Sequence, residues 1–291
     1  MGETSGDATL RWAEGAWSDV QGYPVSITFL ADRAVYAANR DVWLSSVGDY
    51  EIFDVGSRDD DSFSIVINTG NAIRWVENID KTLAIGTTGK SWSLQTNRVG
   101  TPITPTNYTV DEQSGDGSST IQPLKIDNAL VYADLQAKRI MRYTFDTNEA
   151  KYLSDELSIL AEHFTKTSTV TWLAYQEHPE PIIWGGMADG TWFSFTINVK
   201  QNVIAYSEHP TDGDVSSGAV IPGTNEDEIW LSIERNLNST DVTVIERMTE
   251  RKVSDVDDYH FVDAGLIYDS TATTTITGLG IQIVTGKHQY C

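Results

Sequence analysis

Residues 181–195 read PIIWGGMADGTWFSF. A short apolar run leads into a turn that contains Asp and Gly, and a second run rich in aromatic residues follows at once. Branched and aromatic side chains favour strands, whereas Gly and Asp favour the tight turns between strands. The stretch therefore predicts a β-hairpin.

The same arrangement occurs four more times along the chain. The matching stretches are 33–44 (RAVYAANRDVWL), 81–94 (KTLAIGTTGKSWSL), 128–143 (NALVYADLQAKRIMRY) and 228–246, which opens EIWLSIERN and reaches its second strand, VTVIE, later. Their first strands are anchored by Val35, Leu83, Leu130, Ile182 and Ile229, which lie 47 to 52 residues apart. A period in this range is typical of four-stranded propeller blades.

Burial gives such a repeat its physical reason. A single four-stranded sheet cannot cover both of its faces, whereas sheets packed against one another in a ring can. We therefore expect an all-β chain, folded as a β-propeller-like array of antiparallel four-stranded blades. Residues 62–68, 73–76 and 203–207 are expected to supply further strands. A β-sandwich with irregular strand spacing is the alternative.

Three segments interrupt the strand pattern. Residues 155–164 (DELSILAEHF) place apolar side chains at helical spacing, which predicts one short helix with Ser154 as its N-cap. Residues 100–123, rich in Thr, Ser, Gly, Asp and Pro, predict a long surface loop between blades, and residues 209–223 predict a shorter turn-rich segment. We expect residues 1–260 to form the propeller-like domain and residues 261–291 to add strands, as a last blade or a small β-module.

Composition narrows the class of protein. The 291 residues are 40% hydrophobic, and no apolar run is long enough for a membrane helix, so no membrane insertion is expected. The only cysteine is Cys291, which excludes an intrachain disulfide and a cysteine-based metal site. Residues 1–10 are polar and acidic and do not resemble a signal peptide.

The charge balance argues against tight binding of nucleic acid. Asp and Glu total 42 against 20 Lys and Arg, a net charge of −22. Proteins that grip nucleic acid neutralise its phosphates with clustered Lys and Arg, and this chain would repel them. The acidic surface is interpreted either as a solvated exterior or as a wall past which DNA slides without adhering.

No catalytic, cofactor-binding or metal-binding residues are predicted. The acidic groups Asp59–Asp61, Glu226–Glu228 and Asp255, Asp257 and Asp258 lack the spacing of a calcium loop and are interpreted as turns. The five histidines, His163, His178, His209, His260 and His288, form no closely spaced metal-ligating pair. Nucleophile-elbow and phosphate-loop patterns are also absent from the sequence.

Two other classes of propeller remain as alternatives. Residues 188–192 (ADGTW) and 88–92 (TGKSW) faintly resemble the Asp-box turns of sialidases, which are themselves structural. Sialidase chemistry would also need an arginine cluster and a tyrosine nucleophile, and nothing in the sequence places that cluster. A carbohydrate-binding propeller would use exposed aromatic residues, but Trp43, Trp92, Trp184 and Trp192 lie in the repeat hairpins, where packing between blades is the expected role.

Residues 12–53 carry a resemblance to a known family. They contain Gly-Ala-Trp-Ser at 15–18, Gly-Tyr-Pro at 22–24, an Arg-containing hairpin (ADRAVYA), and Gly-Asp-Tyr-Glu-Ile-Phe at 48–53. Further matches are Asp59–Asp61, NAIRW at 71–75, residues 83–92 and Ile-Thr-Gly-Leu at 276–279. In order and spacing these segments resemble the nozzle, or tail tubular protein B, group of short-tailed bacteriophages. Members of that group are usually longer than this chain.

The resemblance implies a non-enzymatic structural subunit of a bacteriophage tail. Such a subunit would form a ring, expected to be a homohexamer, that is part of the nozzle through which DNA is ejected. Its expected partners are the tail adaptor and portal-proximal proteins, tail fibres, and DNA that passes without tight binding. The expected location is the virion, after assembly in the cytoplasm of the host bacterium.

Overall fold

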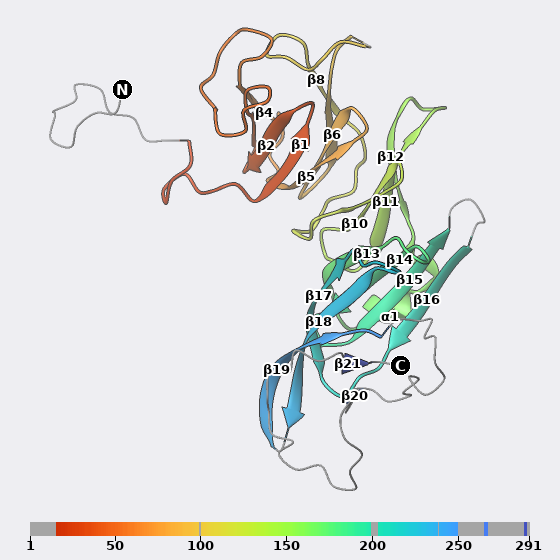
Figure 1. Ribbon diagram of the computed structural model, residues 1–291. Helices are drawn as coiled ribbons and strands as arrows, with labels where there is room; N and C mark the ends of the chain where they lie inside the picture. The colour runs from red at the N-terminus through yellow and green to blue at the C-terminus, as the bar shows by residue number, and fades with distance from the viewer. Residues whose placement is uncertain are drawn as a thin grey trace, which may run out of the picture. The chain divides into compact units, whose positions relative to one another are not determined.

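The computed structural model describes residues 16–98, 100–198, 203–237, 239–249, 265–266 and 288–289 (Figure 1). The chain divides into two compact units, Met1–Gly117 and Ser118–Cys291. Each unit is built from antiparallel sheets whose strands follow one another in chain order. None of the described helices is long and apolar enough to cross a membrane.

The first unit contains two four-stranded meanders. The first sheet has the order β1-β2-β3-β4 and the second the order β5-β6-β7-β8. Their strands are β1 (Ser26–Leu30), β2 (Arg33–Ala38), β3 (Asp41–Leu44), β4 (Phe63–Val66), β5 (Ile73–Ile79), β6 (Thr82–Thr87), β7 (Ser91–Gln95) and β8 (Thr109–Glu112). The hairpins predicted at 33–44 and 81–94 are the two central strands of these sheets.

The two sheets of the first unit share one apolar core. It contains buried residues from both sheets, among them Val35, Leu44, Val76, Leu83 and Leu94. The sheets are also joined by hydrogen bonds between β1 and β5. The Ser26 hydroxyl accepts a bond of 3.0 Å from the Val76 amide, and the Asn78 side-chain amide donates to the Phe29 carbonyl at 2.7 Å. One blade therefore packs against the next, as the burial argument requires.

The second unit contains three further meanders. Two have four strands and one has three, in the orders β12-β11-β10-β9, β13-β14-β15-β16 and β17-β18-β19. Their strands are β9 (Leu124–Ile126), β10 (Ala129–Ala133), β11 (Ile140–Asp146), β12 (Lys151–Glu156), β13 (Val170–Gln176), β14 (Ile182–Met187), β15 (Trp192–Asn198), β16 (Val203–His209), β17 (Asp214–Ile221), β18 (Glu228–Leu237) and β19 (Thr240–Arg247). The hairpins predicted at 128–143, 181–195 and 228–246 again form central or adjacent strands of one sheet.

The protein is therefore a nearly all-β, β-propeller-like array of antiparallel blades, and the predicted fold class is confirmed. Near the C-terminus the structure describes only β20 (Gly265–Leu266) paired with β21 (His288–Gln289). The domain boundary predicted at 260/261 lies outside the described residues and stays a prediction.

The predicted helix is shorter than expected and begins later. Residues 151–156 belong to β12, so Ser154 is a strand residue, and its hydroxyl bonds to that of Tyr132 at 2.9 Å. A 3-10 turn, Ser158–Leu160, and the helix α1, Glu162–Thr165, follow. Pairing with β11 overrides the helical spacing because a strand at this position completes the sheet.

Two segments expected to be loops each supply a strand. Within 100–123, β8 is the fourth strand of its sheet, and Ile103 and Ser118 are buried. Within 209–223, β17 pairs along most of its length with β18. β8 and β17 each lie at a sheet edge, and much of their surface is exposed. Exposed strands can contain many polar residues, so their sequences resemble those of loops.

Three sheets repeat one irregularity in their first strand. β5, β13 and β17 each contain a β-bulge, which inserts Arg74, Thr171 and Ser216, respectively, between paired residues. After the first two bulges a tryptophan lies opposite a glycine of the next strand, so Trp75 faces Gly86 and Trp172 faces Gly186. A Cβ atom on either glycine would overlap the indole ring.

Candidate functional site

Asp59, Asp60 and Asp61 lie in the loop between β3 and β4, as the turn interpretation predicted. The loop is held by Arg33, the first residue of β2, whose side chain is fully buried. The guanidinium donates to the carbonyls of Ser45 at 2.6 Å, Asp61 at 2.7 Å and Asp59 at 2.7 Å. This acidic group therefore supplies backbone acceptors to a buried cation.

Burial lowers the pKa of Arg33, and the nearby carboxylates of Asp60 and Asp61 oppose that shift. The cation also lies 5.4 Å from the centre of the Phe63 ring. Because a buried charge is costly unless it is hydrogen-bonded, the three carbonyls that accept from its two terminal nitrogens explain how Arg33 is tolerated, although its Nε has no partner among the described residues. Its role is structural.

An aromatic cluster contains one residue from each of three segments that carry the resemblance, namely Trp17, Tyr36 and Phe53. Tyr36 and Trp43 lie opposite each other on β2 and β3. Trp17 covers them with ring centres 5.1 and 5.5 Å away, and Phe53 approaches Trp17 at 5.3 Å and Tyr36 at 5.4 Å. The segments before β1 and after β3 thus fold back over one face of the first blade.

The remaining acidic groups also have structural contacts where they are described. The Asp227 carboxylate accepts backbone bonds from Glu177 and His178 at 2.8 and 2.9 Å, and Glu228 is paired with Arg247. Asp255, Asp257 and Asp258 lie outside the described residues. Among the residues that the structure describes, no three His, Cys, Asp or Glu side chains gather in a way that could hold a metal ion.

The histidines are scattered. His209 packs on Trp192, with ring centres 4.7 Å apart, and one of its ring nitrogens lies 2.7 Å from the Ser194 hydroxyl. His163 lies against Phe164, at 4.2 Å between centres. His260 and the side chain of His288 are outside the described part of the chain.

The Asp-box-like turn at 188–192 closes the β14–β15 hairpin. The Asp189 carboxylate accepts the Thr191 hydroxyl at 2.7 Å and the Thr191 amide at 3.2 Å. The hydroxyl bond is the main reason that the pKa of Asp189 lies below its ordinary value. Trp192 is buried against Trp184, with ring centres 5.3 Å apart. This turn stabilises the blade, and the expected packing role of both tryptophans is confirmed.

Trp43 and Trp92 are partly buried rather than fully buried. Trp43 contacts Trp17, and Trp92 packs against the core of the first unit. Among the described residues, three arginines that a sialidase could gather are instead paired separately: Arg139 with Asp134 in the turn between β10 and β11, Arg142 with Asp155 between β11 and β12, and Arg235 with Glu246 between β18 and β19.

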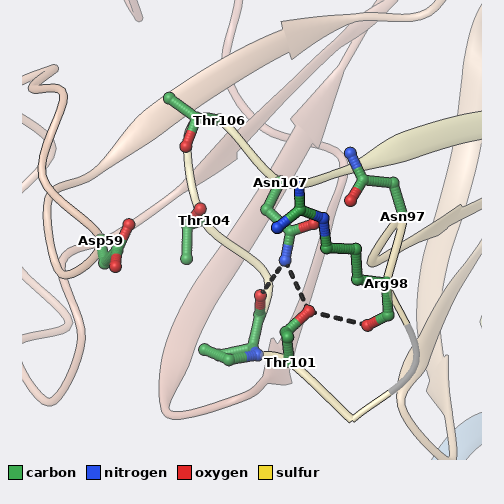
Figure 2. A pocket seen from close by; sticks show the side chains of 8 residues that line it. Asp59, Asn97, Arg98, Thr101, Thr104, Thr106 and Asn107 are labelled. Atoms are coloured by element: carbon green, nitrogen blue, oxygen red, sulfur yellow. Dashed lines mark hydrogen bonds between the residues drawn. The ribbon is translucent and has the colours of Figure 1, made fainter.

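A polar pocket lies in the first unit, between the loop that follows β3 and the loop that follows β7. Its volume is about 330 Å³ and its lining consists of Asp59, Asn97, Arg98, Thr101, Pro102, Thr104, Thr106 and Asn107. Figure 2 shows Asp59 on one side and Asn97 and Arg98 on the other. Sequence analysis missed this site because residues 100–123 were interpreted as a surface loop. The sequence feature that could have indicated a polar site is the high proportion of Thr and Asn in residues 96–107.

Hydrogen bonds fix one wall of the pocket. The two N–H groups of the Asn107 side-chain amide are shared among three acceptors, the hydroxyls of Thr96 and Thr101 at 2.9 and 2.8 Å and the Pro102 carbonyl at 2.8 Å. The Thr101 hydroxyl in turn donates to the Arg98 carbonyl at 2.7 Å (Figure 2). These bonds join Thr96, Thr101 and Asn107 in one wall of the pocket.

Comparison with known proteins adds little beyond the fold. No protein-family model matches the chain, and no curated protein sequence matches it. A solved β-propeller domain of Cps50 (Swd1) from Myceliophteria thermophila is similar over 73% of this chain and 67% of that one, with 10% identity and a TM-score of 0.44. Raptor from Chaetomium thermophilum is similar over 72% of this chain and 18% of its own, with 11% identity and a TM-score of 0.48. An auxiliary nutrient binding protein from Bacteroides thetaiotaomicron is similar over 78% and 55% of the two chains, with 9% identity and a TM-score of 0.43.

Proposed function

We propose that this chain is a structural, non-catalytic subunit of a bacteriophage tail and forms part of the ring-shaped nozzle through which DNA is ejected. The observation that carries the proposal is the structural role of residues 16–61. Segments that resemble the nozzle group contribute to three parts of the first blade. They supply strand residues, the aromatic residues Trp17 and Phe53 that cover one face, and the Arg33 side chain with the Asp59 and Asp61 carbonyls that it binds.

Rigidity supports this role. A conduit for DNA needs a wall that keeps its shape, and the first unit ties its longest loop to the sheet through a buried cation. Arg33 connects β2 to the end of β3 and to two points of the loop that follows. Charge-assisted hydrogen bonds of this kind are about twice as strong as neutral ones.

The charge of the chain supports passage of DNA without adhesion. Carboxylates exceed basic groups by 22. A ring of six such subunits would carry a strongly negative field, and phosphates that approach its surface would be repelled rather than bound. The proposal includes a lumen lined by carboxylates.

Cryo-electron microscopy of the virions that carry this protein tests the proposal. We expect six copies in a ring at the distal end of the tail, with exposed carboxylates facing the channel. A protein found only outside the particles would refute the nozzle assignment. A ring whose channel is neutral or basic would refute the acidic lumen and leave the position of the subunit intact.

Filter binding of purified protein to double-stranded DNA gives an independent test. We expect no retention even at about 50 mM salt, where basic DNA-binding proteins bind far more tightly than at physiological salt. A basic DNA-binding protein measured in parallel serves as the positive control. Salt-sensitive binding by this chain would contradict the proposed passage without adhesion.

A further inference from the structure

The pocket described above has properties that the nozzle role does not use. Its volume of about 330 Å³ lies at the lower end of the range for small-molecule sites. It is lined almost entirely by polar side chains that come from two loops of neighbouring sheets.

Two polar atoms in this lining have no hydrogen-bond partner among the described residues. Thr104 is 4% exposed, and its hydroxyl is buried and unpartnered. The side-chain oxygen of Asn107 also has no partner, although the amide nitrogen of the same side chain lies within hydrogen-bond distance of three acceptors. Because buried polar groups are nearly always hydrogen-bonded in folded proteins, these two atoms leave this side of the pocket with unused hydrogen-bonding capacity.

The charges around the pocket restrict the kind of ligand. Arg98 would repel a cation, and Asp59 together with the net charge of −22 would disfavour an anion. The lining offers donors at Arg98 and Asn97, an acceptor at Asp59, and threonine hydroxyls that can do both. A neutral molecule with several hydroxyl groups can satisfy donors and acceptors at once.

We propose that this pocket binds a neutral saccharide of one or two sugar units, through Asp59, Arg98, Thr104 and Asn107. The site is prepared for it on both sides. Arg33 fixes the backbone of Asp59 at 2.7 Å, and Tyr108, which follows Asn107, stacks on Phe63 with ring centres 5.8 Å apart. Such preorganisation lowers the entropy lost on binding.

Ligand-observed NMR with the 291-residue chain tests the proposal. The probes are glucose, galactose, mannose, N-acetylglucosamine, maltose and lactose, each titrated to about 50 mM. For a small neutral ligand in a partly open site we expect at least one saturable interaction, with a dissociation constant on the order of 1 mM.

Matched variants locate the binding. Thr104→Val keeps the side-chain shape but removes the hydroxyl, and should weaken binding about fivefold. Arg98→Gln removes the charged donor and should weaken it about tenfold. The controls Thr147→Val and Arg40→Gln change exposed residues in other turns and should leave the affinity unchanged. Asp59→Asn, which preserves size, replaces Thr104→Val if that variant fails to fold.

Three results would overturn the assignment. The first is the absence of saturable binding by all six sugars. The second is tighter binding of glucuronate or inorganic phosphate than of any neutral sugar, which would make the pocket an anion site. The third is sugar binding that Thr104→Val and Arg98→Gln leave intact. Because these measurements use purified protein, they are independent of where the chain sits in a virion.

Discussion

Replacement of Arg33 by methionine should destabilise the first unit more than any exposed charge substitution. The guanidinium donates three hydrogen bonds to backbone carbonyls, at 2.6, 2.7 and 2.7 Å. At about 1.5 kcal/mol for each charge-assisted bond, the three together contribute about 4.5 kcal/mol. Methionine fills a similar volume and avoids the cost of burying a charge, so we expect a net loss of about 3 kcal/mol.

Replacement of Arg33 by lysine should lower the free energy of unfolding by less than replacement by methionine. Arg33→Lys keeps the charge, but a single ammonium cannot serve three carbonyls arranged around a planar fork. We expect a loss of about 1.5 kcal/mol, half of that for methionine. Arg142→Met is the matched control, because Arg142 pairs with Asp155 at 2.9 Å in a partly exposed setting. Its loss should be at most about 1 kcal/mol.

Urea denaturation followed by tryptophan fluorescence measures the free energies, and hydrogen exchange read by mass spectrometry assigns them to a unit. In Arg33→Met, amides of residues 54–62 and of β2 and β3 should exchange faster, whereas those of β13–β16 should not change. Equal free-energy losses for Arg33→Met and Arg142→Met, or unchanged exchange in 54–62, would refute the reasoning.

Three other expectations concern the second unit. Arg235 and Glu246 form a buried pair at 2.7 Å, so Glu246→Gln should cost about 3 kcal/mol in urea unfolding, whereas replacing both by methionine should cost less, since no buried charge is left alone. Gly186→Ala should cost about 1 to 3 kcal/mol in the same assay, because the added methyl group overlaps the indole of Trp172. The pKa of Asp189, followed by carboxyl NMR, should lie below that of an unfolded peptide. Its contribution to stability is therefore present above the unfolded-state pKa and disappears as the pH falls through the folded-state pKa; a pKa at or above the peptide value would contradict this.

The central strands of the blades could be predicted from sequence, because their composition directly reflects burial on both faces. β6 (TLAIGT) and β14 (IIWGGM) are buried at every position, and runs of this kind have few alternatives in a chain rich in turns. The regular spacing between hairpins adds long-range information that no single strand contains.

The edge strands and the pocket could not be predicted in the same way. β8 (TVDE) is polar because much of it is exposed, so its sequence resembles a loop. The pocket depends on the approach of Asp59 to lining residues between Asn97 and Asn107, which lie 38 to 48 positions away in the sequence. Nothing local indicates that approach, since the core packing of Ile103 and Tyr108 produces it.

The buried arginines were missed for a related reason. Nothing in the sequence marks Arg33 and Arg235 as buried, because arginine is almost never fully buried unless it is paired. Their burial depends on acceptors that come from other segments: three carbonyls for Arg33, and Glu246 with the Asp212 carbonyl for Arg235.

The bulges in β5, β13 and β17 affect how readily the edges of these sheets can pair with other strands. Each of these strands lies at the edge of its sheet, and a regular edge would offer unpaired amides and carbonyls to any other strand. The extra residue bends the edge, and the Thr171 and Ser216 hydroxyls bond back to the neighbouring strand at 3.2 and 3.0 Å. The bulged edges therefore present a less regular row of amides and carbonyls for edge-to-edge pairing with another strand.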